Sequence, residues 1–257
     1  MISDNFYEEA ENYYVNGEYS KALKLFKKCY ELDEDKDSLN YIGCCYLQLN
    51  ELNSAINVFS GLISTCPDWE RPIFNLGRVY LKQNMHTEAL ECFNKALVMN
   101  PKAEEIYYYL GVYSYKINDF DKAIEYYKKS LSIDNCQPEV HLNLGICYSK
   151  LGMHEIALDE IDIAYNLDNK YLDALFNKAI VCLAMKNYHK ALDAFLSLDK
   201  LQPDDIENMV DIASCYYRIN NLDKSLEWVE KILRQDVNNM KANKLLKIIT
   251  TKKGNVN

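Results

Sequence analysis

The chain has 257 residues, 49% of them hydrophobic and 26% charged, which is ordinary for a folded soluble protein. Its formal net charge of -9 argues against a nucleic acid as the main partner, because phosphate binding requires a basic face. No run of 18 apolar residues is present, and the segment Met1 to Phe6 lacks the basic and apolar regions of a signal peptide. We therefore expect a cytoplasmic protein without a membrane span, with its nine cysteines reduced.

A 34-residue repeat runs along the chain, carried by two tracks of small residues. The first track consists of Ala10, Gly43, Gly77, Gly111, Gly145, Ala179 and Ala213. The second track consists of Ala22, Ala55, Ala89, Ala123, Ala157, Ala191 and Ser225. Successive members are 34 residues apart, except for one gap of 33 in each track. This period predicts stacked units of two antiparallel helices, A and B, with the small residues where the two helices cross.

Prolines and turn residues place the expected helix ends. Pro67, Pro101 and Pro203 cannot continue a helix, so helix B of the corresponding units should end there. The pairs Asn16-Gly17, Asn118-Asp119 and Leu151-Gly152 mark turns between helices A and B. The predicted units are 3–36, 36–69, 70–103, 104–137, 138–171, 172–205 and 206–239.

One further helix is predicted over residues 240–253. Apolar residues with i, i+3, i+4, i+7 spacing share one face of it, namely Ala242, Leu245, Leu246 and Ile249. Lysines occupy the rest of the helix. We expect it to cap the last unit.

These features resemble the tetratricopeptide repeat (TPR) family. Its unit has small residues at positions 8 and 20, large apolar residues at 4, 7, 11 and 24, and often proline at 32. The third unit matches this pattern with Ile73, Leu76, Gly77, Tyr80, Ala89, Phe93, Ala96 and Pro101. The resemblance implies an all-α superhelix of about fifteen antiparallel helices, forming a single solenoid over residues 1–257. The departures are Glu9 and Lys178 at position 7, Ser114 at position 11 and Ser225 at position 20.

No catalytic or metal-binding pattern is found in the sequence. His86 and His154 both stand at position 17, two units apart, which is too far to share a metal, and His141 stands at a core position. A glycine-rich phosphate loop, a nucleophile elbow and a His-Glu-x-x-His motif are all missing. We therefore expect no enzyme activity, no cofactor and no metal.

The resemblance implies a binding surface, because A helices line the inner groove of TPR arrays. The groove residues predicted to bind a peptide are Phe74, Asn75, Arg78, Lys82, Tyr108, Lys116, Asn143, Lys150, Phe176 and Asn177. Each group has a structural alternative. The apolar residues can pack against neighbouring A helices, and the asparagines can bond a neighbouring helix. The lysines can reflect the favourable position of cations near a helix C-terminus.

The predicted function is a scaffold whose groove, in units 3 to 6, binds an extended and acidic segment of another protein. A self-associating structural subunit and a regulatory subunit of an enzyme on another chain are the alternatives. A pentatricopeptide-like RNA binder is disfavoured by the 34-residue period and the negative charge. We favour a monomer.

Overall fold

The computed structural model describes residues 2–254, and these form fifteen α-helices and no strand. The helices are α1 (Ile2–Val15), α2 (Tyr19–Asp33), α3 (Lys36–Gln48), α4 (Leu52–Thr65), α5 (Glu70–Lys82), α6 (His86–Met99), α7 (Glu104–Lys116), α8 (Phe120–Ile133), α9 (Pro138–Lys150), α10 (His154–Leu167), α11 (Leu172–Ala184), α12 (Tyr188–Leu201), α13 (Ile206–Arg218), α14 (Leu222–Gln235) and α15 (Met240–Gly254). The prediction of an all-α fold with fifteen helices is confirmed.

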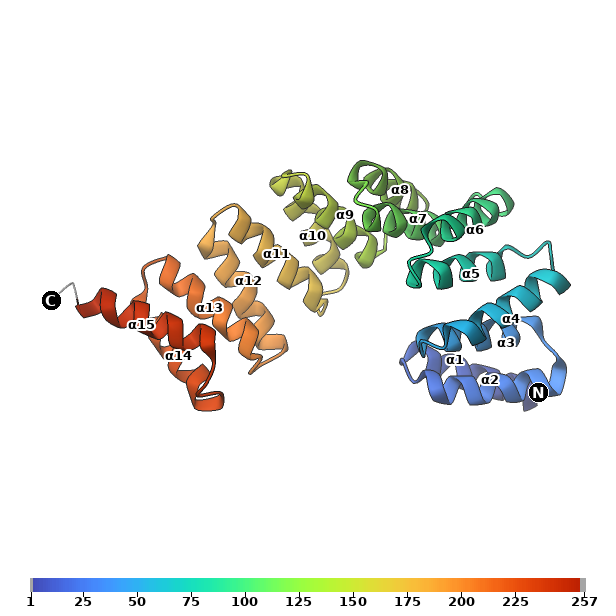
Figure 1. Cartoon of the computed structure of the whole chain (residues 1–257), viewed down its shortest axis with the longest axis horizontal. Coiled ribbons are helices and arrows are strands. Elements are labelled where there is room, and N and C mark those ends of the chain that lie inside the picture. Colours follow the sequence, from blue (N-terminus) through green and yellow to red (C-terminus); the bar gives the residue numbers. More distant parts are fainter. Residues whose placement is uncertain (1, 255–257) are drawn as a thin grey trace. The chain divides into compact units, whose positions relative to one another are not determined.

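Consecutive helices pair into seven hairpins, from α1/α2 to α13/α14, and α15 follows the last (Figure 1). Odd-numbered helices up to α13 are the A helices, and even-numbered ones are the B helices. The chain divides into two compact units, which we call unit 1 (helices α1 to α8, to Asp134) and unit 2 (helices α9 to α15, from Asn135). The 34-residue helical hairpins are called repeats from here on. Within each unit the hairpins stack on their neighbours in chain order.

The small residues of the two tracks lie where helices A and B cross. A Cβ atom added at Gly43 would lie 2.5 Å from the ring of Phe59, and one at Gly111 would lie 2.5 Å from the ring of Tyr127. These rings are fully buried, so the close crossing excludes any larger residue. All members of the second track, from Ala22 to Ser225, are fully buried as well. The predicted crossing is therefore confirmed.

Ser225, the departure in the second track, is compensated by a hydrogen bond. Its hydroxyl donates to the carbonyl of Ala213 on the facing A helix at 2.7 Å. The two residues that belong to the two small-residue tracks in this hairpin are thus bonded directly. Ser114 is different, because its buried hydroxyl has no hydrogen-bond partner among the described residues.

Every turn between helices A and B contains one residue in the left-handed conformation. These residues are Gly17, Asn50, Asn84, Asn118, Gly152, Lys186 and Asn220. The N–H of the next residue then bonds a carbonyl five residues back, as Glu51 does to Tyr46 at 2.8 Å. This is the Schellman ending of a helix, which satisfies its last carbonyl groups. The turns predicted at Gly17, Asn118 and Gly152 are confirmed.

Helix α15 packs on α13 and α14, as expected for a capping helix. Ala242 and Ile249 are buried against Met209 and Val229. Lysines of α15 also contact the last hairpin through the ion pairs Lys241–Glu207 and Lys253–Asp223. The predicted cap over 240–253 is confirmed.

Candidate functional site

The A helices of unit 1 line an open cleft of about 570 Å³, which we call the Tyr41 cleft. Its lining comprises Tyr7, Tyr14, Asp37, Asn40, Tyr41, Cys44, Trp69, Glu70, Arg71, Asn75, Arg78 and Glu105. The Tyr41 hydroxyl donates to Glu11 at 3.1 Å, and Arg71 pairs with Glu105 at 2.5 Å. Burial, together with Glu11, raises the pKa of Tyr41 to about 12, so this phenol remains a neutral donor at physiological pH.

The floor of the Tyr41 cleft is a network around Asn75 and Arg78. Asn75 is 1% exposed; its Nδ2 donates to Asn40 Oδ1 at 2.9 Å, and its Oδ1 accepts from Arg78 Nη1 at 2.9 Å. The Arg78 guanidinium also lies 5.0 Å from the ring centroid of Tyr109 and 5.7 Å from that of Phe74. Phe74 itself is only 2% exposed. Asn75 and Arg78 therefore form the floor of this cleft, whereas Phe74 does not line it and is buried with the Arg78 guanidinium over its ring.

A second cleft, of about 230 Å³, shares Arg78 with the first, and we call it the Lys82 cleft. It is lined by Leu47, Gln48, Arg78, Leu81, Lys82, Tyr109, Val112 and Lys116. Lys82 Nζ donates to the Leu47 carbonyl at 3.0 Å, whereas Lys116 is exposed and has no ion pair within the described part of the chain. Three cations and no acid thus surround an apolar floor.

The structure places the other predicted groove residues apart from these two clefts. Tyr108 is half-buried, with its ring centroid 6.1 Å from that of Tyr127. In unit 2, Asn143 is half-buried and Lys150 is exposed. Asn177 Nδ2 donates to the carbonyl of Asp173 in its own helix at 2.8 Å. The asparagines at position 6 therefore differ, since Asn75 bonds a neighbouring helix and Asn177 bonds its own.

Phe176 lies in a cleft of about 260 Å³ within unit 2, which we call the Phe176 cleft. The lining residues are Leu172, Asp173, Phe176, Leu198, Gln202, Asp205, Glu207, Asn208 and Asp211. Four of them are acidic and none is basic, which the sequence analysis did not predict. A signal was available, because Asp173 and Glu207 stand at position 2 and Asp211 at position 6, and both positions face the groove in the TPR family.

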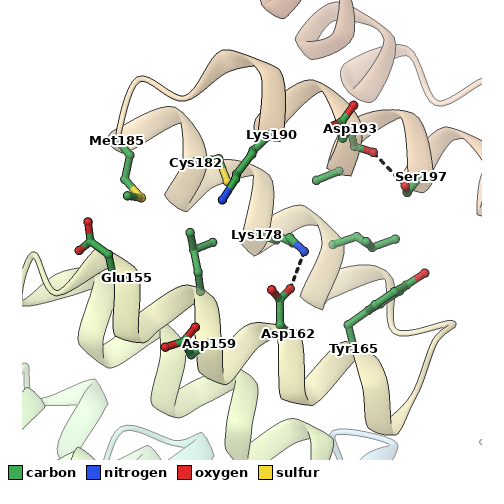
Figure 2. Close-up of a pocket in the computed structure, with 13 residues that line it drawn as sticks. Glu155, Asp159, Asp162, Tyr165, Lys178, Cys182, Met185, Lys190, Asp193 and Ser197 are labelled. Atoms are coloured by element: carbon green, nitrogen blue, oxygen red, sulfur yellow. Dashed lines mark hydrogen bonds and ion pairs between the residues drawn. The ribbon is translucent and has the colours of Figure 1, made fainter.

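A pocket of about 460 Å³ opens between helices α10, α11 and α12, around Lys178. Lys178 stands at position 7, where the three preceding repeats carry leucine, and its Nζ pairs with Asp162 at 2.5 Å. Figure 2 shows Glu155 and Asp159 on α10 on one side of this pocket and Lys190 of α12 on the other. Because the charges face one another across it, we interpret the pocket as a polar seam that replaces the usual leucine packing.

The histidine at the core position has a structural role. His141 Nδ1 lies 2.7 Å from Glu160 Oε2, and its Nε2 lies 3.3 Å from the Asn135 carbonyl.

Between residues 2 and 254, no three His, Cys, Asp or Glu side chains come together as a metal site requires. In the same range, no helix is both long and apolar enough to span a bilayer.

Comparison with known proteins supports the repeat assignment. The tetratricopeptide repeat model matches residues 74–139, and the model of the regulator of microtubule dynamics protein 1-3 family matches residues 166–252. No curated protein matches the sequence.

Several solved structures share the fold at low sequence identity. The APC/C hetero-tetramer Cut9–Hcn1 has a chain with a TM-score of 0.72 and 18% identity; the match covers 93% of this chain and 48% of that one, so this chain spans about half of its length. Pseudomonas aeruginosa PilF has a TM-score of 0.70 and 15% identity, over 84% of this chain and 98% of its own. YrrB, described as a TPR protein with an unusual peptide-binding site, has a TM-score of 0.54 and 23% identity, over 72% and 95%.

Proposed function

Because this chain is built of tetratricopeptide repeats, we propose that it is a protein-interaction scaffold whose A helices bind an extended segment of a partner protein. Protein binding follows from the repeat architecture, because stacked repeats create an extended surface that repeat proteins use to bind partners. The clefts of unit 1 supply the more specific part of the proposal. They combine aromatic and apolar lining residues with polar groups, of which Asn75, Arg78 and Lys82 are held by hydrogen bonds.

The charge of the Lys82 cleft indicates which side chains the partner should present. Arg78, Lys82 and Lys116 surround it, and no carboxylate among the lining residues offsets their charge. An acidic side chain would therefore be attracted here, although the whole chain carries a net charge of -9. Leu81 and Val112 offer an apolar surface beside these cations for a neighbouring side chain of the partner.

An extended segment matches the spacing of the A helices. Packed helices lie about 10 Å apart, and an extended chain advances about 3.3 Å per residue. About three residues of the partner would therefore pass each repeat. Within unit 1, acidic residues at this interval would meet Lys82 and then Lys116.

The test is a selection of random twelve-residue peptides displayed on phage, with the full-length chain as bait. We expect the enriched peptides to carry acidic residues with hydrophobic or aromatic residues between them. A counter-selection uses the variant Lys82→Glu with Lys116→Glu, which should retain few of these peptides. Enriched peptides that lack acidic residues, or that this variant retains fully, would show that another surface binds.

A further inference from the structure

The Phe176 cleft of unit 2 contains an aromatic ring that the rest of the unit leaves partly exposed. Phe176 and Phe74 both occupy position 5 of their repeats, yet Phe176 is 43% exposed and Phe74 is 2% exposed. Leu172 and Leu198 extend the apolar surface beside the ring. An apolar surface rimmed by charged groups is typical of an interaction site.

The rim of this cleft is acidic, and two of its carboxylates are already engaged. Asp205 caps helix α13 by accepting from the Asn208 N–H at 2.9 Å, and Glu207 pairs with Lys241 of α15. Asp211 is different: it is half-buried and has no hydrogen bond or ion pair within residues 2–254. Burial raises the pKa of Asp211, and the opposing effect of Lys241 does not cancel this rise. Its negative charge is therefore poorly compensated.

A buried acceptor in the wall of the cleft is also unsatisfied. Asn208 is 6% exposed, and its Nδ2 donates to the Phe195 carbonyl at 3.2 Å. Its Oδ1 has no hydrogen-bond partner among the described residues. Buried acceptors are nearly always paired in folded proteins. The wall and the rim thus both favour an occupant that donates hydrogen bonds and carries positive charge.

We propose that the Phe176 cleft receives an arginine side chain of the partner segment. The planar guanidinium can stack on the Phe176 ring and still donate to the carboxylates of Asp173 and Asp211. The cleft volume of about 260 Å³ lies below the roughly 300–1,000 Å³ of small-molecule sites, which fits one long side chain. This inference rests on the proposed function and deepens it: the partner is acidic at the Lys82 cleft and basic at the Phe176 cleft.

The test titrates the full-length chain with N-acetyl-arginine amide and follows backbone amide shifts by NMR. N-acetyl-citrulline amide at matched ionic strength is the control probe, because it has the same shape without the charge. We expect saturable shifts confined to α11 and α13 with the arginine probe, and binding at least about tenfold weaker with the citrulline probe. Equal shifts with both probes, or no saturable shift with arginine, would overturn the proposal.

Two substitutions locate the binding. Asp211→Asn is isosteric and Phe176→Leu changes an exposed side chain, so both variants should fold. Each should weaken arginine binding by at least about twofold. Glu227→Gln, an exposed residue of α14 in the same unit, makes the same charge change as Asp211→Asn and should leave binding unchanged. If arginine binds all three variants like the parent chain, the cleft is not its site.

The two proposals can fail separately. The arginine titration reads only residues of unit 2, whereas the peptide selection depends on Lys82 and Lys116 of unit 1. If arginine binds but no acidic peptide is enriched, the proposed function is overturned and the arginine site in the Phe176 cleft is supported. If acidic peptides are enriched but arginine does not bind, the proposed function is supported and the arginine site is overturned.

Discussion

A single added methyl group should have opposite effects at two helical glycines. In Gly111→Ala the new Cβ would lie 2.5 Å from the buried ring of Tyr127, so we expect a loss of about 1–3 kcal/mol in the free energy of unfolding. In Gly61→Ala, at an exposed position of helix α4, the Cβ meets nothing within 4 Å. Alanine is the better helix former, so we expect a gain of about 0.5–1 kcal/mol. Urea denaturation measures both, and shifts of equal sign would contradict the close crossing.

Asp211 should make the stability of the chain depend on pH. A carboxyl whose pKa is raised on folding favours the protonated form, so its ionised form destabilises the fold at neutral pH. The charged groups facing it are Lys241 of α15, Glu207 of α13, Asp205 at the N-cap of α13, and Asp173 across the cleft.

Asp211→Asn should therefore raise the melting temperature at pH 7. The gain should shrink as the pH falls toward about 4, where the carboxyl of the parent chain also becomes neutral. Thermal unfolding followed by circular dichroism at several pH values measures this, with Glu227→Gln as the control. A lower melting temperature for Asp211→Asn at pH 7 would mean that the carboxylate is stabilised in the fold. Higher stability combined with weaker arginine binding is the expected signature of a binding residue.

The nine cysteines should differ strongly in reactivity, and none forms a disulfide in the structure. Burial raises the pKa of Cys45 and Cys147 to about 12, which leaves almost no thiolate at pH 8. Cys136 is the exposed one. We expect iodoacetamide to label Cys136 first and the buried thiols last, as measured by peptide mass spectrometry. Fast labelling of Cys45 or Cys147 in the native chain would contradict the packing, and in denaturant all nine should react alike.

At the scale of elements, one turn between helices A and B is built from an unfavourable residue. Lys186 has φ of 58° at the position where the other turns carry glycine or asparagine. The left-handed conformation costs an L-residue other than glycine about 1–2 kcal/mol, and asparagine tolerates it best. Lys186→Gly should therefore raise the free energy of unfolding by about 0.5–1 kcal/mol after the greater entropy of the unfolded glycine is counted. Asn84→Gly is the matched control and should change less.

The helices and their crossings could be predicted from the sequence because each depends on local, periodic information. The 34-residue phase of glycine and alanine locates the crossing, and asparagine or glycine after helix A locates the turn. Lys186 shows the limit of this reasoning, because its left-handed turn follows from its place in the repeat and not from its own preference.

The candidate site could be predicted only in part, because the exposure of a groove position depends on its neighbours. Phe74 and Phe176 share position 5, but Arg78 and Tyr109 lie over Phe74, whereas Phe176 stays exposed. The side-chain amide of Asn75 likewise donates a hydrogen bond to Asn40, which is 35 residues away in the chain. Such contacts between neighbouring repeats cannot be predicted from the position of a residue within one repeat.

At the scale of the whole molecule, the two units offer clefts of opposite charge. The Lys82 cleft of unit 1 has three cations and no acid, and the Phe176 cleft of unit 2 has four acids and no base. A partner segment with acidic and basic residues at separate places would be recognised by both. The net charge of -9 describes neither surface, so peptide preference should follow the local clefts rather than the overall charge.

The most direct test of the scaffold proposal is the affinity of one selected acidic peptide, measured by fluorescence anisotropy at low salt. Lys82→Glu with Lys116→Glu should weaken binding by about 2- to 30-fold, because each exposed ion pair is worth about 0.2–1 kcal/mol. Lys24→Glu with Lys95→Glu makes the same change of charge on the B helices α2 and α6, and should leave the affinity nearly unchanged. Equal losses in the two double variants, or none in either, would contradict binding by the A helices.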